Sequence, residues 1–185
     1  MGFIYLFLDI DGVLNHSETK ETYNGCIGID PECLANLIEI LFYFKDARIV
    51  ISSSWRLTNS LFDIINILGE TMNKLPQYSK HDGIEFFKTR VIGRTPPERE
   101  SRGAEIAEWL EENAGVKIER WRSSKEAIFI AIDDSISDIM EYLNAYHIVQ
   151  TRFMSPFKGL EFHHIKEVVK LVNFQESLAE KSYVL

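Results

Sequence analysis

The sequence has few cysteines, few prolines and few glycines. Its 185 residues include two cysteines, five prolines and ten glycines. Cys26 and Cys33 are too few for a disulfide framework, and neither has a Cys or His partner at metal-ligand spacing. We therefore expect a protein of a reducing compartment, for which the cytoplasm is the simplest location.

Long apolar runs are also missing. The longest apolar runs, residues 3–8 and 127–132, are far shorter than the roughly 20 residues that a membrane-spanning helix needs. The N-terminus lacks a basic leading segment and a small-residue cleavage site. We expect neither a membrane partner nor a secretory signal.

Positive charge is scarce. There are 20 Lys and Arg residues against 28 Asp and Glu, which gives a formal net charge of −8. The mean field of such a protein repels phosphate, so the charge disfavours nucleic acid as a partner, although a local basic pocket is still compatible with it. The length and the 45% hydrophobic content suit one globular domain, predicted over residues 1–175 with a C-terminal tail over 176–185.

Short apolar runs alternate with amphipathic helical patterns along the chain. Such alternation predicts an α/β fold, a doubly wound, Rossmann-like parallel sheet of about five strands with helices on both faces. Strands are predicted over residues 3–8, 48–51, 91–93, 127–132 and 145–149. Helices are predicted over residues 31–44, 61–68 with Gly69 at the end, 103–113, 136–143 and 163–173.

Three of the apolar runs end in polar clusters. The clusters are Asp9-Ile10-Asp11-Gly12, Ser52-Ser53-Ser54 and Asp133-Asp134. The carboxyl ends of parallel strands meet at one edge of a sheet, where ligands of this fold class bind. Four converging carboxylates repel one another unless a divalent cation neutralises them, and hard oxygen ligands favour Mg²⁺. We therefore predict Asp9, Asp11, Asp133 and Asp134 as metal-binding residues.

This arrangement suits phosphoryl transfer. A carboxylate such as Asp9 can attack phosphorus and form an acyl phosphate that water then cleaves. Asp11, two residues further on, is placed to protonate the leaving group and then to activate water. A simple turn or helix cap is the alternative interpretation. A calcium loop of the EF-hand type is excluded because its glycine stands sixth, whereas Gly12 is fourth.

Residues 7–15, Phe-Leu-Asp-Ile-Asp-Gly-Val-Leu-Asn, resemble the first motif of the haloacid dehalogenase (HAD) superfamily. In that family the first aspartate is the nucleophile, and the second is the acid and base. The backbone carbonyl of the second aspartate also contacts magnesium. The resemblance implies these roles for Asp9 and Asp11.

The second HAD motif is a Ser or Thr that hydrogen-bonds the transferring phosphoryl group. Residues 49–56, Ile-Val-Ile-Ser-Ser-Ser-Trp-Arg, are similar to it, with Ser53 as the predicted residue and Ser52 as the alternative. The Ser-Trp-Arg sequence also resembles a subgroup of small HAD proteins that includes domains associated with RNA repair. Arg56 either reaches the phosphate or fixes the turn.

The third HAD motif is a Lys or Arg that offsets carboxylate repulsion and holds phosphoryl oxygens. Arg102, before a predicted helix, fits best, and Arg94, Arg99 and Lys125 are the alternatives. We predict Arg102 as both a catalytic and a phosphate-binding residue.

The fourth HAD motif is an acid pair after the fourth strand, which Asp133-Asp134 matches. We expect Asp134 to bind Mg²⁺ directly and Asp133 to lie behind it. Asp138, one helical turn onward, is a further partner candidate.

HAD enzymes select substrates mainly through cap insertions, and both insertion points are short here. Residues 15–30 allow a small flap and residues 69–90 a modest insertion, so we expect no large cap and an open site. The resemblance implies a Mg²⁺-dependent phosphomonoester hydrolase acting on a small phosphorylated metabolite or nucleotide. A polynucleotide-end phosphatase, a phosphotransferase or mutase, and a non-catalytic phosphate-binding module are the alternatives. An oligomer in which a second subunit supplies a lid is compatible with an open site.

Overall fold

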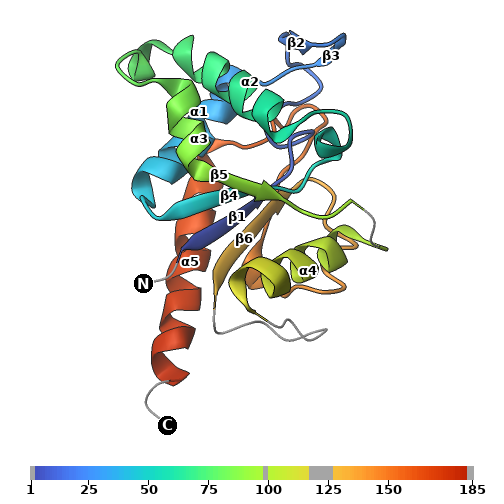
Figure 1. Ribbon diagram of the computed structural model, residues 1–185, viewed down its shortest axis with the longest axis vertical. Coiled ribbons are helices and arrows are strands. Elements are labelled where there is room, and N and C mark those ends of the chain that lie inside the picture. The colour runs from blue at the N-terminus through green and yellow to red at the C-terminus, as the bar shows by residue number, and fades with distance from the viewer. Residues whose placement is uncertain (1–2, 98–99, 117–126, 183–185) are drawn as a thin grey trace.

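The computed structural model contains a five-stranded, all-parallel sheet (Figure 1). It describes residues 3–97, 100–116 and 127–182. The strands are β1 (Ile4–Leu8), β4 (Ala47–Ile51), β5 (Val91–Arg94), β6 (Ile128–Asp133) and β7 (Ile148–Gln150). Their order in the sheet is β5-β4-β1-β6-β7, so the chain moves outward from β1 first in one direction and then in the other. The predicted α/β fold is confirmed.

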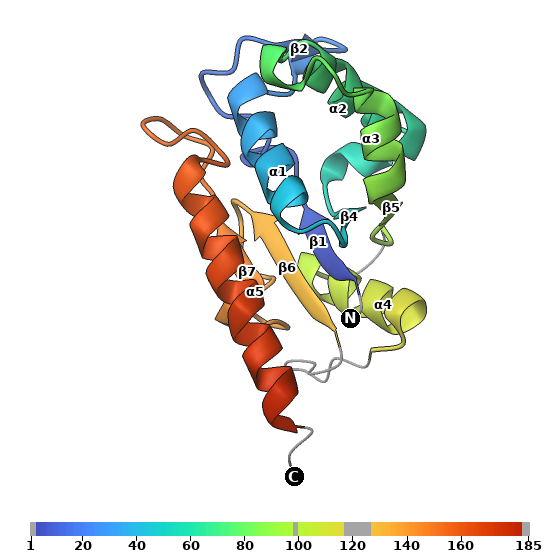
Figure 2. The same cartoon turned by 90° about the vertical axis from the view of Figure 1, so that its left-hand side faces the viewer.

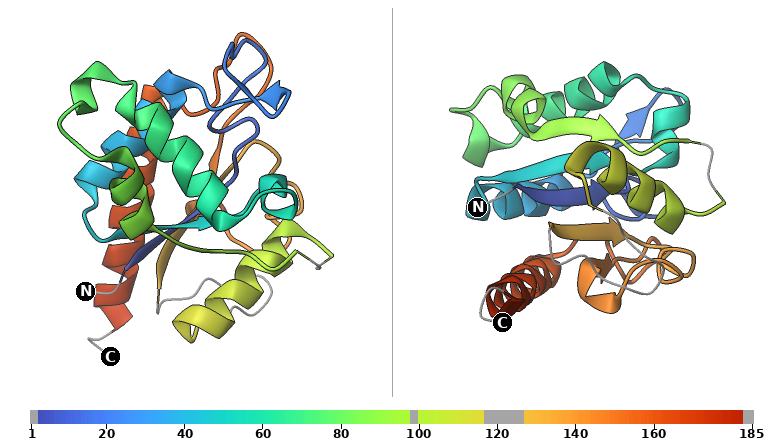
Figure 3. Two further views of the ribbon diagram at one scale, coloured as in Figure 1. Left: turned by 45° about the horizontal axis from the view of Figure 1, so that its top comes forward. Right: turned by 60° about the horizontal axis from the view of Figure 1, so that its bottom comes forward.

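Helices cover both faces of the sheet (Figures 2 and 3). They are α1 (Pro31–Tyr43), α2 (Leu61–Asn73), α3 (Gly83–Arg90), α4 (Arg102–Ala114) and α5 (Phe162–Ser182). Successive side chains of a strand point to opposite faces, so β1 contributes to two hydrophobic clusters. Leu6 and Leu8 pack with residues of α1, α2, α3 and α5, whereas Phe7 packs with residues of α4.

Short elements connect the main ones. Three 3₁₀ helices, η1 (Ser54–Leu57), η2 (Pro76–Tyr78) and η3 (Ala145–His147), are present among the described residues. The predicted flap contains a hairpin of β2 (Thr22–Tyr23) and β3 (Cys26–Ile27). Asn24 and Gly25 form its turn with φ angles of 51° and 80°, which Asn-Gly pairs readily adopt. The described residues include no large cap, as predicted. Among the described residues, no helix is both long enough and apolar enough to cross a membrane.

The prediction that Gly69 ends the second helix is wrong. Helix α2 continues to Asn73, and α3, which was not predicted, packs against it. A Cβ atom at Gly69 would lie 2.5 Å from the backbone of Ile84 in α3. The glycine therefore permits a close helix crossing inside α2 and does not serve as a terminal cap.

The predicted helix over residues 136–143 is also wrong. The segment forms turns, with separate backbone hydrogen bonds such as Met140 to Ile136 (2.9 Å) and Leu143 to Ile139 (2.9 Å). Buried Ile139 and Leu143 contribute to the cluster under α4, so their spacing reflects burial without requiring a regular helix. Residues 145–147, predicted as strand, belong to η3.

Helix α5 is longer than predicted. It continues beyond residue 173, and residues 176–182 are helical where a tail was predicted. Gln175 explains part of this extension, because it is buried and its amide exchanges hydrogen bonds with the backbone N–H (3.1 Å) and carbonyl (3.0 Å) of Phe129 in β6. The sequence pattern of apolar residues does not reveal such a polar anchor.

Candidate active site

The polar clusters that follow β1, β4 and β6 meet at one edge of the sheet. The backbone N–H of Asp9 donates to the carbonyl of Ile132 (3.0 Å), and that of Ser52 donates to the carbonyl of Leu8 (2.8 Å). Strand pairing therefore continues to the first polar residue of each turn. β1 lies between β4 and β6, where the direction of winding reverses, so Asp9 occupies the position at which this fold class binds ligands.

Three carboxylates form a compact cluster at this edge. Asp9, Asp133 and Asp134 each offer one oxygen, and these oxygens all lie within 4.8 Å of one another. Burial raises the pKa of Asp9 to about 6, and burial together with the Asp9 carboxylate raises the pKa of Asp133 to about 7. The pKa of Asp134 is raised as well, mainly by burial. An all-oxygen donor set of crowded acids fits a hard divalent cation such as Mg²⁺.

Gly12 allows Asp134 to approach the first motif. A Cβ atom at Gly12 would lie 2.3 Å from Cγ of Asp134, and the φ angle of Gly12 is 78°. Only glycine combines this backbone conformation with the space that the carboxyl group occupies. The turn after β1 is thus shaped around the aspartate that follows β6.

Arg102 lies between two of these carboxylates. Its Nη1 atom is 3.7 Å from Oδ1 of Asp9 and 3.8 Å from Oδ2 of Asp133. The same nitrogen is buried and makes no hydrogen bond among the described residues. The Arg102 charge lowers the pKa of both aspartates, although burial outweighs it. A donor so placed can hold a phosphoryl oxygen beside the nucleophile.

The two serine candidates lie in different surroundings. Ser53 is fully buried and its hydroxyl hydrogen-bonds Asp9, which lowers the pKa of that carboxyl group. The hydroxyl of Ser52 is buried without a hydrogen-bond partner among the described residues. The structure therefore brings Ser53 to the nucleophile, and its contact with a phosphoryl group stays a prediction.

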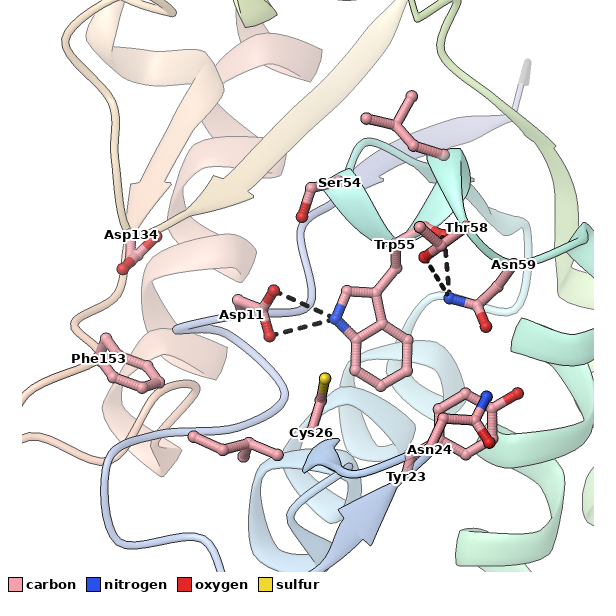
Figure 4. A pocket seen from close by; sticks show the side chains of 12 residues that line it. Asp11, Tyr23, Asn24, Cys26, Ser54, Trp55, Thr58, Asn59, Asp134 and Phe153 are labelled. Atoms are coloured by element: carbon pink, nitrogen blue, oxygen red, sulfur yellow. Dashed lines mark hydrogen bonds between the residues drawn. The ribbon is translucent and has the colours of Figure 1, made fainter.

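Asp11 does not belong to the carboxylate cluster, and its side chain points to Trp55 (Figure 4). Its Oδ1 accepts a hydrogen bond from Nδ2 of Asn15 (2.9 Å), and both of its oxygens accept from Nε1 of Trp55 (3.2 and 3.1 Å). Oδ1 of Asn15 in turn accepts from the N–H of Gly12 (3.0 Å). These hydrogen bonds fix the orientation of the carboxylate, and its role as acid and base stays a prediction. Of the four carboxylates that were predicted to converge, three therefore form the cluster and that of Asp11 does not, whereas the contact that the family resemblance implies between its backbone carbonyl and magnesium stays a prediction.

The guanidinium of Arg56 makes two buried hydrogen bonds. Its Nη2 donates to Oε2 of Glu105 (2.6 Å) and its Nη1 to the carbonyl of Ser53 (2.6 Å). Glu105 also lies 3.8 Å from Nε of Arg102. Of the two roles that the sequence left open for Arg56, this geometry favours fixing the turn. Each terminal nitrogen carries a second N–H and the buried Nε makes no hydrogen bond among the described residues, so the predicted phosphate contact of Arg56 stays a prediction.

Of the remaining basic candidates, the structure describes only Arg94. Arg94 donates from Nη1 to the carbonyl of Arg56 (3.0 Å). Arg99 and Lys125 lie outside the described residues. Asp138 accepts from the backbone N–H of Arg102 (2.8 Å), so it supports the start of α4 and thereby the arginine.

Sequence reasoning missed three residues of the site. Asn15 stands in the first motif four positions after Asp11, and that spacing was a usable signal. Trp55 was noticed only as part of the Ser-Trp-Arg signature, with no role for its indole. No sequence pattern pointed to Glu105, because its importance comes from a contact with Arg56, 49 positions away.

Comparison with known proteins gives one match. The family model described as "HAD domain in Swiss Army Knife RNA repair proteins" matches residues 5–161, a range that contains every residue of the site. No curated protein and no solved structure matches significantly.

Proposed function

Because the chain belongs to the family of HAD domains in Swiss Army Knife RNA repair proteins, we propose that it is a Mg²⁺-dependent phosphomonoester hydrolase that works through an aspartyl phosphate on Asp9. The predicted resemblance to small HAD proteins is confirmed by this match. The observation that carries the proposal is the position of Asp9, which lies between Arg102, Ser53 and two further carboxylates at the edge of the sheet.

Asp9 and Asp11 divide the chemistry between them. An Asp9 oxygen attacks phosphorus, the bond from phosphorus to the leaving oxygen breaks, and Asp11 gives that oxygen its proton. Asp11 then takes a proton from the water that attacks the aspartyl phosphate, and Asp9 and inorganic phosphate are released. Arg102 and Ser53 would hold phosphoryl oxygens during both steps.

Asp9, Asp133 and Asp134 would hold the metal ion. We propose Asp134 as a direct ligand and Asp133 as the residue behind it. The bound ion neutralises the acids and the incoming phosphate, so that an anionic nucleophile can meet an anionic substrate. Arg102 supplies one positive charge beside these carboxylates, and burial still raises the pKa of Asp9 to about 6 in its presence.

The substrate is a phosphate monoester on a small metabolite or on a nucleotide, and a nucleic-acid end is the second candidate. The family description, which names RNA repair proteins, favours the nucleic-acid end. The net charge of −8 favours the smaller substrate. The lack of a large cap in the described residues is compatible with both and disfavours a mutase, which needs water excluded.

Release of phosphate from p-nitrophenyl phosphate, with and without Mg²⁺, tests the proposal. Turnover is expected to require Mg²⁺ and to be lost in Asp9→Asn, which keeps the size of the side chain. Activity that survives in Asp9→Asn would contradict the mechanism. If the wild type is inactive on a panel of phosphomonoesters and phosphorylated oligonucleotides, the non-catalytic alternative is supported instead.

A further inference from the structure

A pocket of about 860 Å³ opens beside the carboxylates. Asp11 and Asp134 form its catalytic end, and the hairpin of β2 and β3 forms a wall together with η1 (Figure 4). The volume is within the range of small-molecule sites. Because Asp11 is the proposed proton donor to the leaving oxygen, the part of the substrate beyond that oxygen must lie in this pocket.

The pocket has an aromatic platform. The rings of Tyr23 and Trp55 stack with an angle of 14° between their planes and 5.5 Å between their centroids. Trp55 comes from η1 and Tyr23 from the hairpin, so two segments 32 positions apart supply a stacked pair of rings, whose outer faces are not covered by each other. Phe153, Leu57 and Ile27 add apolar surface around it. A flat, weakly polar group is the natural occupant of such a surface.

The polar groups of the pocket beyond the acids carry no charge. Asn24, Thr58 and Asn59 contribute amides and a hydroxyl. No Lys or Arg lines the pocket in the part of the chain that the structure describes. A run of several phosphodiesters would find no cation here, whereas the edge of one heteroaromatic ring would find donors and acceptors.

We propose that this pocket is a stacking subsite for the single nucleoside that carries the phosphate, with its base on the outer face of the stacked Tyr23 and Trp55 pair. The inference rests on the proposed function and adds the identity of the leaving group. A free nucleoside monophosphate and the terminal nucleotide of a nucleic acid present the same chemistry to the subsite. Sugar phosphates carry no aromatic base, so they lack the group that the stacked rings recognise.

Cys26 allows a test of binding that does not depend on turnover. It lines the pocket and is exposed, whereas Cys33 is buried. In the Asp9→Asn variant, alkylation of Cys26 by iodoacetamide is expected to slow in the presence of adenosine monophosphate but not of ribose 5-phosphate. Cys26→Ser should abolish the labelling, which identifies the reacting thiol. Equal protection by the two compounds, or none by the nucleotide, would overturn the subsite.

Tyr23 allows a test of specificity, because it does not contact Asp11. In Tyr23→Ala, the ratio of kcat/KM for adenosine monophosphate to kcat/KM for ribose 5-phosphate is expected to fall by about 5- to 150-fold, the worth of one stacked base. Tyr23→Phe keeps the ring and should restore the ratio. An unchanged ratio in Tyr23→Ala would contradict the proposal even if hydrolysis itself is confirmed.

The same ratio distinguishes the two sources of the nucleoside. The kcat/KM values for adenosine monophosphate and for an oligonucleotide with a terminal phosphate are each divided by the kcat/KM value for ribose 5-phosphate. Tyr23→Ala should lower the ratio for whichever of the two substrates the wild type prefers. If the wild type hydrolyses no substrate but Cys26 is still protected by the nucleotide, the proposed function fails and the subsite stands. Hydrolysis of ribose 5-phosphate as efficient as that of the nucleotide would leave the proposed function intact and reject the subsite.

Discussion

The indole N–H of Trp55 lies 3.1 and 3.2 Å from the two carboxylate oxygens of Asp11. The tryptophan therefore fixes the orientation of the proposed acid and base, in addition to forming part of the pocket. Asn15 provides a second hydrogen bond to the same carboxylate at 2.9 Å. Proton transfer depends on this geometry, so the donor on Trp55 should affect the rate more than the binding of phosphate.

Trp55→Phe is expected to lower kcat by about 10-fold, because it keeps an aromatic ring but removes the donor that orients Asp11. Steady-state kinetics with Mg²⁺ across a pH series measures this. Trp109→Phe is the matched control, since Trp109 packs on Tyr5 and Phe7 away from the acids. A kcat in Trp55→Phe equal to that of Trp109→Phe would rule out the positioning role.

Arg102→Ala is expected to lower kcat/KM by about 10²- to 10³-fold, the usual effect of removing one preorganised donor to a reacting group. The reason is the position of its Nη1 atom, 3.7 Å from Asp9 and without a hydrogen bond of its own in the described residues. Arg94→Ala is the control, because Arg94 donates to a backbone carbonyl instead. If the two variants lose activity equally, Arg102 is not the phosphate-binding residue.

Gly12→Ala and Gly25→Ala separate backbone strain from steric displacement. The φ angles are 78° and 80°, so both variants should lose about 1–2 kcal/mol in the free energy of unfolding. Only Gly12→Ala places a Cβ against Asp134, whereas nothing lies within 4 Å at Gly25. We expect Mg²⁺ affinity, measured by calorimetry, to fall in Gly12→Ala alone. Equal affinities in the two variants would show that Asp134 does not depend on this contact.

Stability without metal should fall as the pH rises. The pKa of Asp9 is raised from 3.8 to about 6 and that of Asp133 from 3.8 to about 7, so the folded state resists ionisation of both groups. Their favourable contribution is complete below about pH 4 and is lost by about pH 7. Mg²⁺ should therefore raise Tm more at about pH 8 than at about pH 5.

Thermal unfolding with Mg²⁺ or with EDTA at both pH values measures this. Asp9→Asn removes one of the crowded charges and should stabilise the metal-free protein at about pH 8 by about 1–3 kcal/mol. A Mg²⁺ effect that is equal at the two pH values would contradict the assignment of these carboxylates to the metal site.

Glu105→Ala is expected to destabilise the protein by about 3–5 kcal/mol, because it leaves the buried guanidinium of Arg56 without its partner. If Arg56 fixes the turn, Arg56→Ala and the double variant should lose a similar amount of unfolding free energy, since each removes the same pair of side chains from contact. Chemical denaturation of the three variants measures this. Additive losses would show that Arg56 and Glu105 act independently.

The fold class and the edge of the sheet that carries the acids could both be predicted from the sequence. Buried parallel strands are apolar runs, and an acid that ends such a run is visible without any long-range information. For this reason the strand before Asp9 and the strand before Asp134 were both predicted close to their observed limits.

The contacts among the candidate residues, in contrast, could not be predicted and became clear from the folded chain. It placed Ser53 and not Ser52 against Asp9, gave Arg56 to Glu105, and brought Trp55 to Asp11. The same holds for Gly69, whose role depends on a second helix that crosses it. These are contacts between residues far apart in the chain, and no local periodicity encodes them, because they depend on how the elements pack.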